Sequence, residues 1–227
     1  MTRAWIFDLD DTLYLERDYV LSGFRAVDNW AQSSINISGF LPIAWDLFLS
    51  GVRGTTITRA FETLGRPLTV PETTTAVNIY RSHEPDIKLC PDASDLLDRL
   101  SQSGDRVGII TDGPAASQRA KLRALKLDCR GYTTVITDDY GATWHKPNTL
   151  AFEHVQAKIG LEPRCFTYIA DNPLKDFTAP RLLGWKTIRV VRSLGLYASL
   201  PCSSTVAARS VGSLTEINDD MEENDHS

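Results

Sequence analysis

The chain has 227 residues, of which 42% are hydrophobic and 23% are charged, and its formal net charge is −5. This balance predicts a soluble globular protein with one large domain or two modest ones. The negative charge argues against general nucleic-acid binding, because no broad basic field would attract a phosphate backbone. No apolar run is long enough to span a membrane, and the N-terminus lacks a secretory signal, so we expect a cytoplasmic protein. The four cysteines show no CxxC spacing and are expected to be free thiols.

The first predicted element is a short buried strand over residues 3–8, which ends in a run of carboxylates. Apolar residues then recur at helical spacing over four segments, 16–33, 41–50, 55–64 and 71–83. There is no convincing second strand before residue 85. We therefore expect a helical module, residues 15–85, inserted after the first strand.

From Pro91 onward, predicted helices and strands alternate. We expect helices over 93–103, 115–125, 149–159 and 173–183, and strands over 107–110, 132–136, 165–170 and 185–191. This alternation is typical of an α/β fold, in which helices cover both faces of a parallel sheet through right-handed crossovers. Residues 203–227 are polar and end in an acidic stretch, so we predict a disordered acidic tail there.

Three of the predicted strands end in a residue suited to bind phosphate or a metal, namely Asp8, Thr111 and Asp171. Because the carboxyl ends of parallel strands meet at one edge of a sheet, we expect these side chains to be neighbours. Asp8 and Asp10 are two residues apart, so an extended backbone would point both carboxylates to the same side. Lys146 follows another strand at this edge. Carboxylates, a hydroxyl and an ammonium group together suit phosphoryl transfer assisted by a hard cation such as Mg²⁺.

Four motifs occur in order along the chain: FDLDDTLY at 7–14, IITDG at 109–113, HKPN at 145–148 and IADNPLKD at 169–176. With them, the sequence resembles the haloacid dehalogenase (HAD) superfamily of phosphohydrolases over nearly the whole chain up to about residue 200. The resemblance implies a Rossmann-like parallel core, residues 1–14 and 86–202, with the strand order 5-4-1-2-3. It also implies that residues 15–85 form a C1-type helical cap. Ala170 departs from the glycine that is commonest at its place.

The resemblance implies a role for each motif residue. Asp8 would be the nucleophile that forms an aspartyl-phosphate, and it would also bind the metal. Asp10 would protonate the leaving oxygen and then activate water, while its backbone carbonyl faces the metal. Thr111 would bind a phosphoryl oxygen together with the backbone N–H groups of Asp112 and Gly113.

The last two motifs supply charges. Lys146 would neutralise the charge shared by Asp8 and the phosphoryl group, and Asp171 would be a direct Mg²⁺ ligand. Asp176 and Asn172 would not bind the metal directly but would hold Lys146 or a metal-bound water in place. In the module between the first two motifs, Arg53 would reach the far end of the substrate, although an exposed loop arginine is the alternative.

These roles predict a Mg²⁺-dependent phosphatase that hydrolyses a small phosphomonoester, such as a nucleotide or a sugar phosphate. We expect a monomer or homodimer whose cap excludes nucleic-acid polymers. A phosphomutase would share the same core residues, and a non-catalytic binding protein on this fold is a further alternative. A 2-haloacid dehalogenase is disfavoured, because dehalogenases lack the counterpart of Asp10. Asp11 is expected to serve in a turn or helix cap, and Glu16, Arg17 and Tyr19 to line the entrance.

Overall fold

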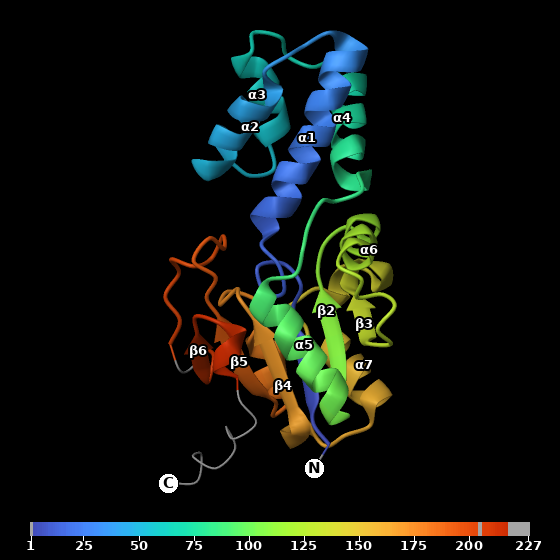
Figure 1. Ribbon diagram of the computed structural model, residues 1–227, viewed down its shortest axis with the longest axis vertical. Helices are drawn as coiled ribbons and strands as arrows, with labels where there is room; N and C mark the ends of the chain where they lie inside the picture. The colour runs from blue at the N-terminus through green and yellow to red at the C-terminus, as the bar shows by residue number, and fades with distance from the viewer. Residues whose placement is uncertain (1, 204–205, 218–227) are drawn as a thin grey trace.

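The computed structural model describes residues 2–203 and 206–217 (Figure 1). Its centre is a six-stranded sheet in the order β3-β2-β1-β4-β5-β6, and every neighbouring pair is parallel. The predicted α/β fold is therefore confirmed, and the expected order of five strands is found with β6 added at one edge. The strands are β1 (Ala4–Phe7), β2 (Arg106–Thr111), β3 (Thr133–Ile136), β4 (Phe166–Ala170), β5 (Lys186–Val190) and β6 (Arg209–Val211).

Alternate residues of β1 show how the two faces of the sheet are covered. Trp5 and Phe7 belong to one apolar cluster, which α5 (Pro91–Ser103) covers, whereas Ala4 and Ile6 belong to the opposite cluster, which α7 (Leu150–Ile159) covers. The strand is buried on both sides, as expected for a central strand of a parallel sheet. α6 (Ala115–Ala124) and α8 (Thr178–Leu182) complete the layers. None of the described helices is long and apolar enough to cross a membrane.

Four helices between β1 and α5 form a separate group at the top of Figure 1. They are α1 (Glu16–Ile35), α2 (Phe40–Leu49), α3 (Thr56–Thr63) and α4 (Val70–Ser82). They bury an apolar cluster of their own, in which the rings of Phe40 and Phe61 stack with centroids 4.8 Å apart. Leu196, from a loop that follows β5, also packs against this cluster. The boundaries given above for the cap remain a prediction.

The prediction of a disordered tail from residue 203 is wrong for the part of it that the structure describes. β6 pairs with β5 in parallel, and the side chains of Val211, Leu214 and Ile217 are buried in the core. Arg99 also donates a hydrogen bond to the carbonyl of Ile217 at 2.9 Å. These apolar residues cover the edge of the sheet, and that contact orders the segment despite its polar composition. Residues 218–227, which carry most of the acidic stretch, lie outside the described residues.

The helix expected over 173–183 is also shorter than predicted, because α8 begins only at Thr178. The Asp176 carboxylate accepts a hydrogen bond from the backbone N–H of Asn172 at 3.0 Å. The side-chain oxygen of Asn172 accepts one from the backbone N–H of Leu174 at 2.9 Å. Such local bonds compete with helix formation. They leave residues 171–177 as a loop at the carboxyl edge of the sheet.

Candidate active site

A hollow of about 290 Å³ lies where the carboxyl ends of the central strands face the helical group. Asp8 and Asp10 line it from the segment after β1, Asp112 from the segment after β2, and Asp171 from the segment after β4. Side chains of α1, α4 and α6 supply much of the remaining wall: Glu16, Tyr19, Tyr80, Ser117, Gln118 and Lys121. The structure therefore brings together predicted site residues from three of the four motifs around one cavity.

Lys146, from the remaining motif, lies directly behind Asp8. Its ammonium nitrogen is 2.5 Å from Asp8 Oδ1 and 2.7 Å from Asp176 Oδ1, and it also donates to the Tyr168 hydroxyl at 3.1 Å. The lysine side chain is fully buried. A buried ammonium between two carboxylates fixes the position of Asp8, whose backbone N–H continues the sheet ladder to Ile169.

Three buried carboxylates, those of Asp8, Asp171 and Asp176, lie close enough to share a cation, with one oxygen of each within 4.8 Å of the others. Burial raises the pKa of Asp171 to about 9, and the charges of Asp8 and Asp176 add to this. Burial likewise raises the pKa of Asp8 to about 7, against the opposing effect of Lys146. These shifts reflect an excess of buried negative charge, and a hard divalent cation with carboxylate ligands would relieve it. The residues therefore fit Mg²⁺.

Asp10 points to a different set of partners. Its Oδ1 accepts hydrogen bonds from the Lys121 ammonium at 2.7 Å and from the Tyr14 hydroxyl, while its Oδ2 is 3.3 Å from the Gln118 amide nitrogen. Burial would raise the pKa of Asp10, but Lys121, Tyr14 and Gln118 together lower it. The Asp10 carboxylate is not part of the three-carboxylate cluster.

The end of β2 provides the groups expected to bind phosphate. Thr111 is fully buried, and its hydroxyl has no hydrogen-bond partner within the described part of the chain. The Asp112 carboxylate is engaged with Thr137 at 2.8 Å and Lys175 at 3.0 Å. Gly113 has a φ of 120°, and a Cβ there would approach the Gln118 amide nitrogen to 2.7 Å. Only glycine suits this position, where the backbone turns past the cavity.

The sequence also singles out Asp11 and Arg53, and the structure shows the contacts of each. Asp11 adopts a φ of 52° and accepts hydrogen bonds from the backbone N–H of Glu16 at 2.8 Å and of Leu196 at 2.7 Å. It thus holds the start of α1, in agreement with the expected turn or cap role.

Arg53 lies outside the cavity of Asp8. Its guanidinium packs over the Phe48 ring, 4.0 Å from the ring centre, and lines a second hollow of about 230 Å³.

Sequence reasoning missed Lys121, Gln118, Lys175 and Tyr197, all of which line the cavity. The first two come from the middle of a helix, where no motif marks them. The sequence shows only that Ser117, Gln118 and Lys121 would share one face of a helix. That this polar face is buried is visible only in the structure.

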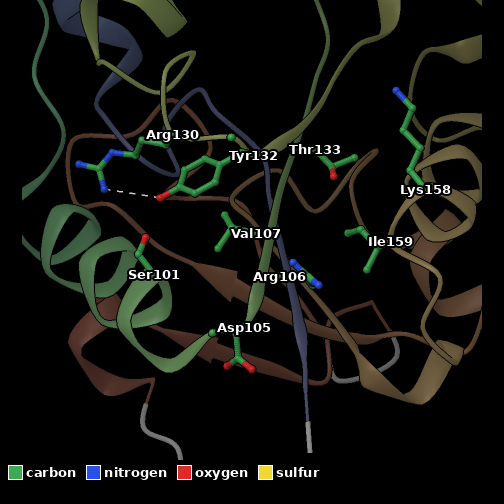
Figure 2. A pocket seen from close by; sticks show the side chains of 11 residues that line it. Ser101, Asp105, Arg106, Val107, Arg130, Tyr132, Thr133, Lys158 and Ile159 are labelled. Atoms are coloured by element: carbon green, nitrogen blue, oxygen red, sulfur yellow. Dashed lines mark hydrogen bonds between the residues drawn. The ribbon is translucent and has the colours of Figure 1, made fainter.

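A larger hollow of about 570 Å³ lies far from these residues, at the amino ends of β2 and β3 (Figure 2). Arg106, Arg130 and Lys158 contribute positive charge to its rim. Figure 2 shows that the three basic side chains do not converge on a common point. Arg130 is moreover engaged with Asp98 at 2.7 Å. None of the predicted site residues lines this hollow; those that line a cavity do so at the opposite edge of the sheet.

Comparisons with known proteins show what this chain is similar to. The family model described as haloacid dehalogenase-like hydrolase matches residues 5–190. The chain is 24% identical over 200 residues to the glyceraldehyde 3-phosphate phosphatase of Methanocaldococcus jannaschii, covering 85% of this chain and 86% of that protein. It is 29% identical over 106 residues to the protein of that name in Methanopyrus kandleri, and this match spans only 45% of that relative.

Among solved structures, the putative HAD-hydrolase YfnB from Bacillus subtilis is similar to this chain with a TM-score of 0.67 and 18% identity. The match covers 95% of this chain and 96% of that one. A 2-haloacid dehalogenase from Pseudomonas syringae is similar with a TM-score of 0.64 and 16% identity, over 95% and 96% of the two chains. At this level of identity, both likenesses establish the fold alone.

Proposed function

Because this chain belongs to the haloacid dehalogenase-like hydrolase family, we propose that it hydrolyses a small phosphomonoester through an aspartyl-phosphate on Asp8. The observation that carries the proposal is the buried Asp8–Lys146–Asp176 group beside the cavity. Relatives named as glyceraldehyde 3-phosphate phosphatases support the same class of reaction.

In the first half of the reaction, an Asp8 oxygen attacks phosphorus and the ester P–O bond breaks. Lys146 holds Asp8 in position and offsets negative charge beside the phosphoryl group, so nucleophile and phosphate can approach each other. Asp10, in its protonated form, gives its proton to the departing ester oxygen, which leaves as an alcohol. The buried Thr111 hydroxyl is available to donate to a phosphoryl oxygen.

In the second half, a water molecule attacks the aspartyl-phosphate. Asp10, now a carboxylate, takes a proton from this water, and inorganic phosphate leaves as Asp8 is restored. The same side chain thus serves as acid and then as base, and it must reach both the leaving oxygen and the attacking water. Its place in the cavity wall beside Asp8 allows this.

Asp8 and Asp171 are the residues that we propose to hold Mg²⁺, together with the backbone carbonyl of Asp10. Asp176 lies close enough to contribute, but its ion pair with Lys146 at 2.7 Å favours the supporting role, which Asn172 shares through its hydrogen bond to Asp176. When bound, the metal neutralises charge on the phosphoryl oxygens and helps to orient them. Arg189 steadies Asp171 by donating to its backbone carbonyl at 2.9 Å.

The leaving group would extend from the catalytic cavity toward the helical group. The second hollow shares Glu16, Tyr80 and Arg81 with the catalytic cavity and is lined further on by Phe24 and other apolar side chains. A cavity of this size accepts a sugar phosphate, a triose phosphate or a nucleotide and excludes polymers. In this proposal Arg53 contacts the far end of the substrate, and the protein is a cytoplasmic monomer or homodimer that acts without nucleic-acid or membrane partners.

The test is phosphate release by purified protein with Mg²⁺, from a panel of sugar phosphates, nucleotides and glyceraldehyde 3-phosphate. We expect release that EDTA abolishes, that needs no added bisphosphate and that Asp8→Asn eliminates. Dependence on a bisphosphate would identify a phosphomutase. Chloride release from a 2-haloacid would identify a dehalogenase, and inactivity on the whole panel would favour a binding protein.

A further inference from the structure

The acid–base carboxylate is clamped by a lysine that none of the motifs contains. We propose that Lys121 is a positioning residue, which holds Asp10 through Oδ1 and leaves Oδ2 as the atom that exchanges a proton with the leaving oxygen and the attacking water. The inference rests on the proposed phosphatase reaction and adds a residue to it.

The two oxygens of Asp10 have different surroundings. Oδ1 accepts from both the Lys121 ammonium, at 2.7 Å, and the Tyr14 hydroxyl. Oδ2 has a single, longer contact of 3.3 Å with the Gln118 amide, which donates more closely to the Asp112 carbonyl at 2.8 Å. A carboxyl proton on Oδ1 would point at the hydrogens of an ammonium or a phenol. The proton of a neutral Asp10 is therefore placed on Oδ2.

Lys121 is itself held firmly. It is 4% exposed, and its ammonium lies 4.3 Å from the centre of the Tyr19 ring. Its place on α6, one turn after Ser117 and Gln118, directs it toward the cavity and away from solvent. A rigid, buried partner restricts the rotation of the Asp10 side chain far more than a solvated lysine would.

Packing alone does not explain why a buried lysine occupies position 121. α6 already buries Ala120 and Leu122 against the core. A purely structural ion pair at this place is commonly replaceable by an apolar pair at little cost. The ion pair between Lys121 and Asp10 instead joins α6 to the carboxylate whose orientation the reaction depends on. We therefore expect the loss of Lys121 to affect catalysis.

The test compares two esters that differ in their need for a proton. The leaving 4-nitrophenolate of 4-nitrophenyl phosphate is stable as an anion, whereas the alkoxide of glycerol 3-phosphate must be protonated as it departs. The quantity measured is kcat/KM with Mg²⁺, because it reports only the steps up to departure of the leaving group. Hydrolysis of the aspartyl-phosphate, which is common to both esters, does not enter it.

For Lys121→Met we expect kcat/KM on glycerol 3-phosphate to fall about 100-fold, within the usual contribution of a general acid. The value on 4-nitrophenyl phosphate should stay within about threefold of wild type. Lys121→Arg, which keeps a charged donor, should recover part of the loss. Arg119→Met is the matched control: it removes a charge from an exposed side chain of the same helix, which pairs with Asp139, and should leave both values unchanged.

Tyr14→Phe provides a second route if Lys121→Met does not fold. It removes the other donor to Asp10 Oδ1 with little change in shape. We expect kcat/KM on glycerol 3-phosphate to fall about tenfold, and the value on 4-nitrophenyl phosphate to change little. Folding of every variant is checked by circular dichroism and thermal unfolding.

Equal losses on the two esters in Lys121→Met and Tyr14→Phe would overturn the positioning role and indicate substrate binding or structural support. Unchanged values on both would overturn it as well. If glycerol 3-phosphate is not cleaved, the sugar phosphate or nucleotide of the panel that is cleaved fastest takes its place. Wild-type protein that cleaves 4-nitrophenyl phosphate but no alkyl ester of the panel lacks the acid catalysis that the assignment requires. Wild-type protein that releases phosphate from no ester of the full panel overturns the proposed function and this inference together, whereas the outcomes above overturn the inference alone.

Discussion

Replacing Lys146 with methionine tests the electrostatic centre of the site without touching the cavity wall. The lysine side chain is fully buried between the carboxylates of Asp8 and Asp176, which lie 2.5 Å and 2.7 Å from its nitrogen. Methionine fills similar space but carries no charge. The substitution therefore leaves two buried carboxylates facing each other without a cation.

The expected loss of stability is large. Removing one partner from a buried ion pair costs about 3–5 kcal/mol, because the other charge stays buried and unpaired. That is a substantial part of the ~5–15 kcal/mol by which a domain is usually stable. For a chain of 227 residues, it corresponds to a fall of about 6–20 °C in Tm.

The measurement is urea unfolding followed by circular dichroism at pH 7 in EDTA, since a bound metal would add its own stabilisation. Lys158→Met is the control, because this lysine is exposed on α7, and it should change the unfolding free energy by no more than ~0.5 kcal/mol. The double variant Lys146→Met/Asp176→Asn should lose less stability than the sum of its single variants. Strict additivity, or a Lys146→Met protein within ~1 kcal/mol of wild type, would refute the reasoning.

Three other predictions concern the same edge of the sheet. Asp8→Asn should abolish phosphate release while leaving the circular dichroism spectrum unchanged, and retained turnover would remove Asp8 as the nucleophile. Asp10→Asn should let phosphoenzyme accumulate in a rapid-quench experiment with 4-nitrophenyl phosphate, whereas turnover at the wild-type rate would remove its proton-transfer role. Burial, with added repulsion from Asp10, raises the pKa of Glu16 from its ordinary value of 4.5 to about 7. The folded state therefore loses stability as the pH rises from 4.5 through 7, and Glu16→Gln should gain ~1–2 kcal/mol in urea unfolding at pH 8 but nothing at pH 4. An equal gain at both values of pH would contradict this cause.

The fold was predictable because its evidence is local and repeated. Each of the five predicted strands appears in the sequence as a short apolar run, and each run except the first follows a predicted helix. The predicted strand over 3–8 is found at Ala4–Phe7, and the family resemblance drawn from four motifs is confirmed by the match over residues 5–190. Parallel strand topology predicts that Asp8, Thr111 and Asp171 are neighbours. Asp8 and Asp171 do line one cavity, whereas at the end of β2 the residue that lines it is Asp112 and not Thr111.

Lys121 was not predictable in the same way. It does not follow a strand, so the topological argument that found Asp171 says nothing about it. Its partner, Asp10, is 111 residues away in the sequence, and the pair forms only when α6 packs beside the segment after β1. Burial of charged residues in a helix depends on the whole tertiary arrangement, which local periodicity does not encode.

The segment after residue 203 was mispredicted for a related reason. Its composition is polar, and composition dominates any estimate of disorder. What orders it is pairing of β6 with β5 and an ion pair at 2.6 Å between Arg192 and Asp92, whose carboxylate also accepts from Ser213. The two contacts of Asp92 join residues that lie 100 and 121 positions apart in the sequence, and only the folded structure brings them together.

The loop that follows β5 contacts both the catalytic cavity and the helical group. Arg189 donates to the carbonyl of Asp171 and also to that of Tyr197, whose side chain lines the catalytic cavity. One residue earlier, Leu196 packs into the helical cluster and lines the second hollow, while its backbone N–H is held by Asp11. Adjacent residues of one loop therefore contact the two hollows. Because Arg189 and Asp11 fix that loop to the strand ends, the same backbone supports the wall of the second hollow and the edge at which we propose that the metal binds.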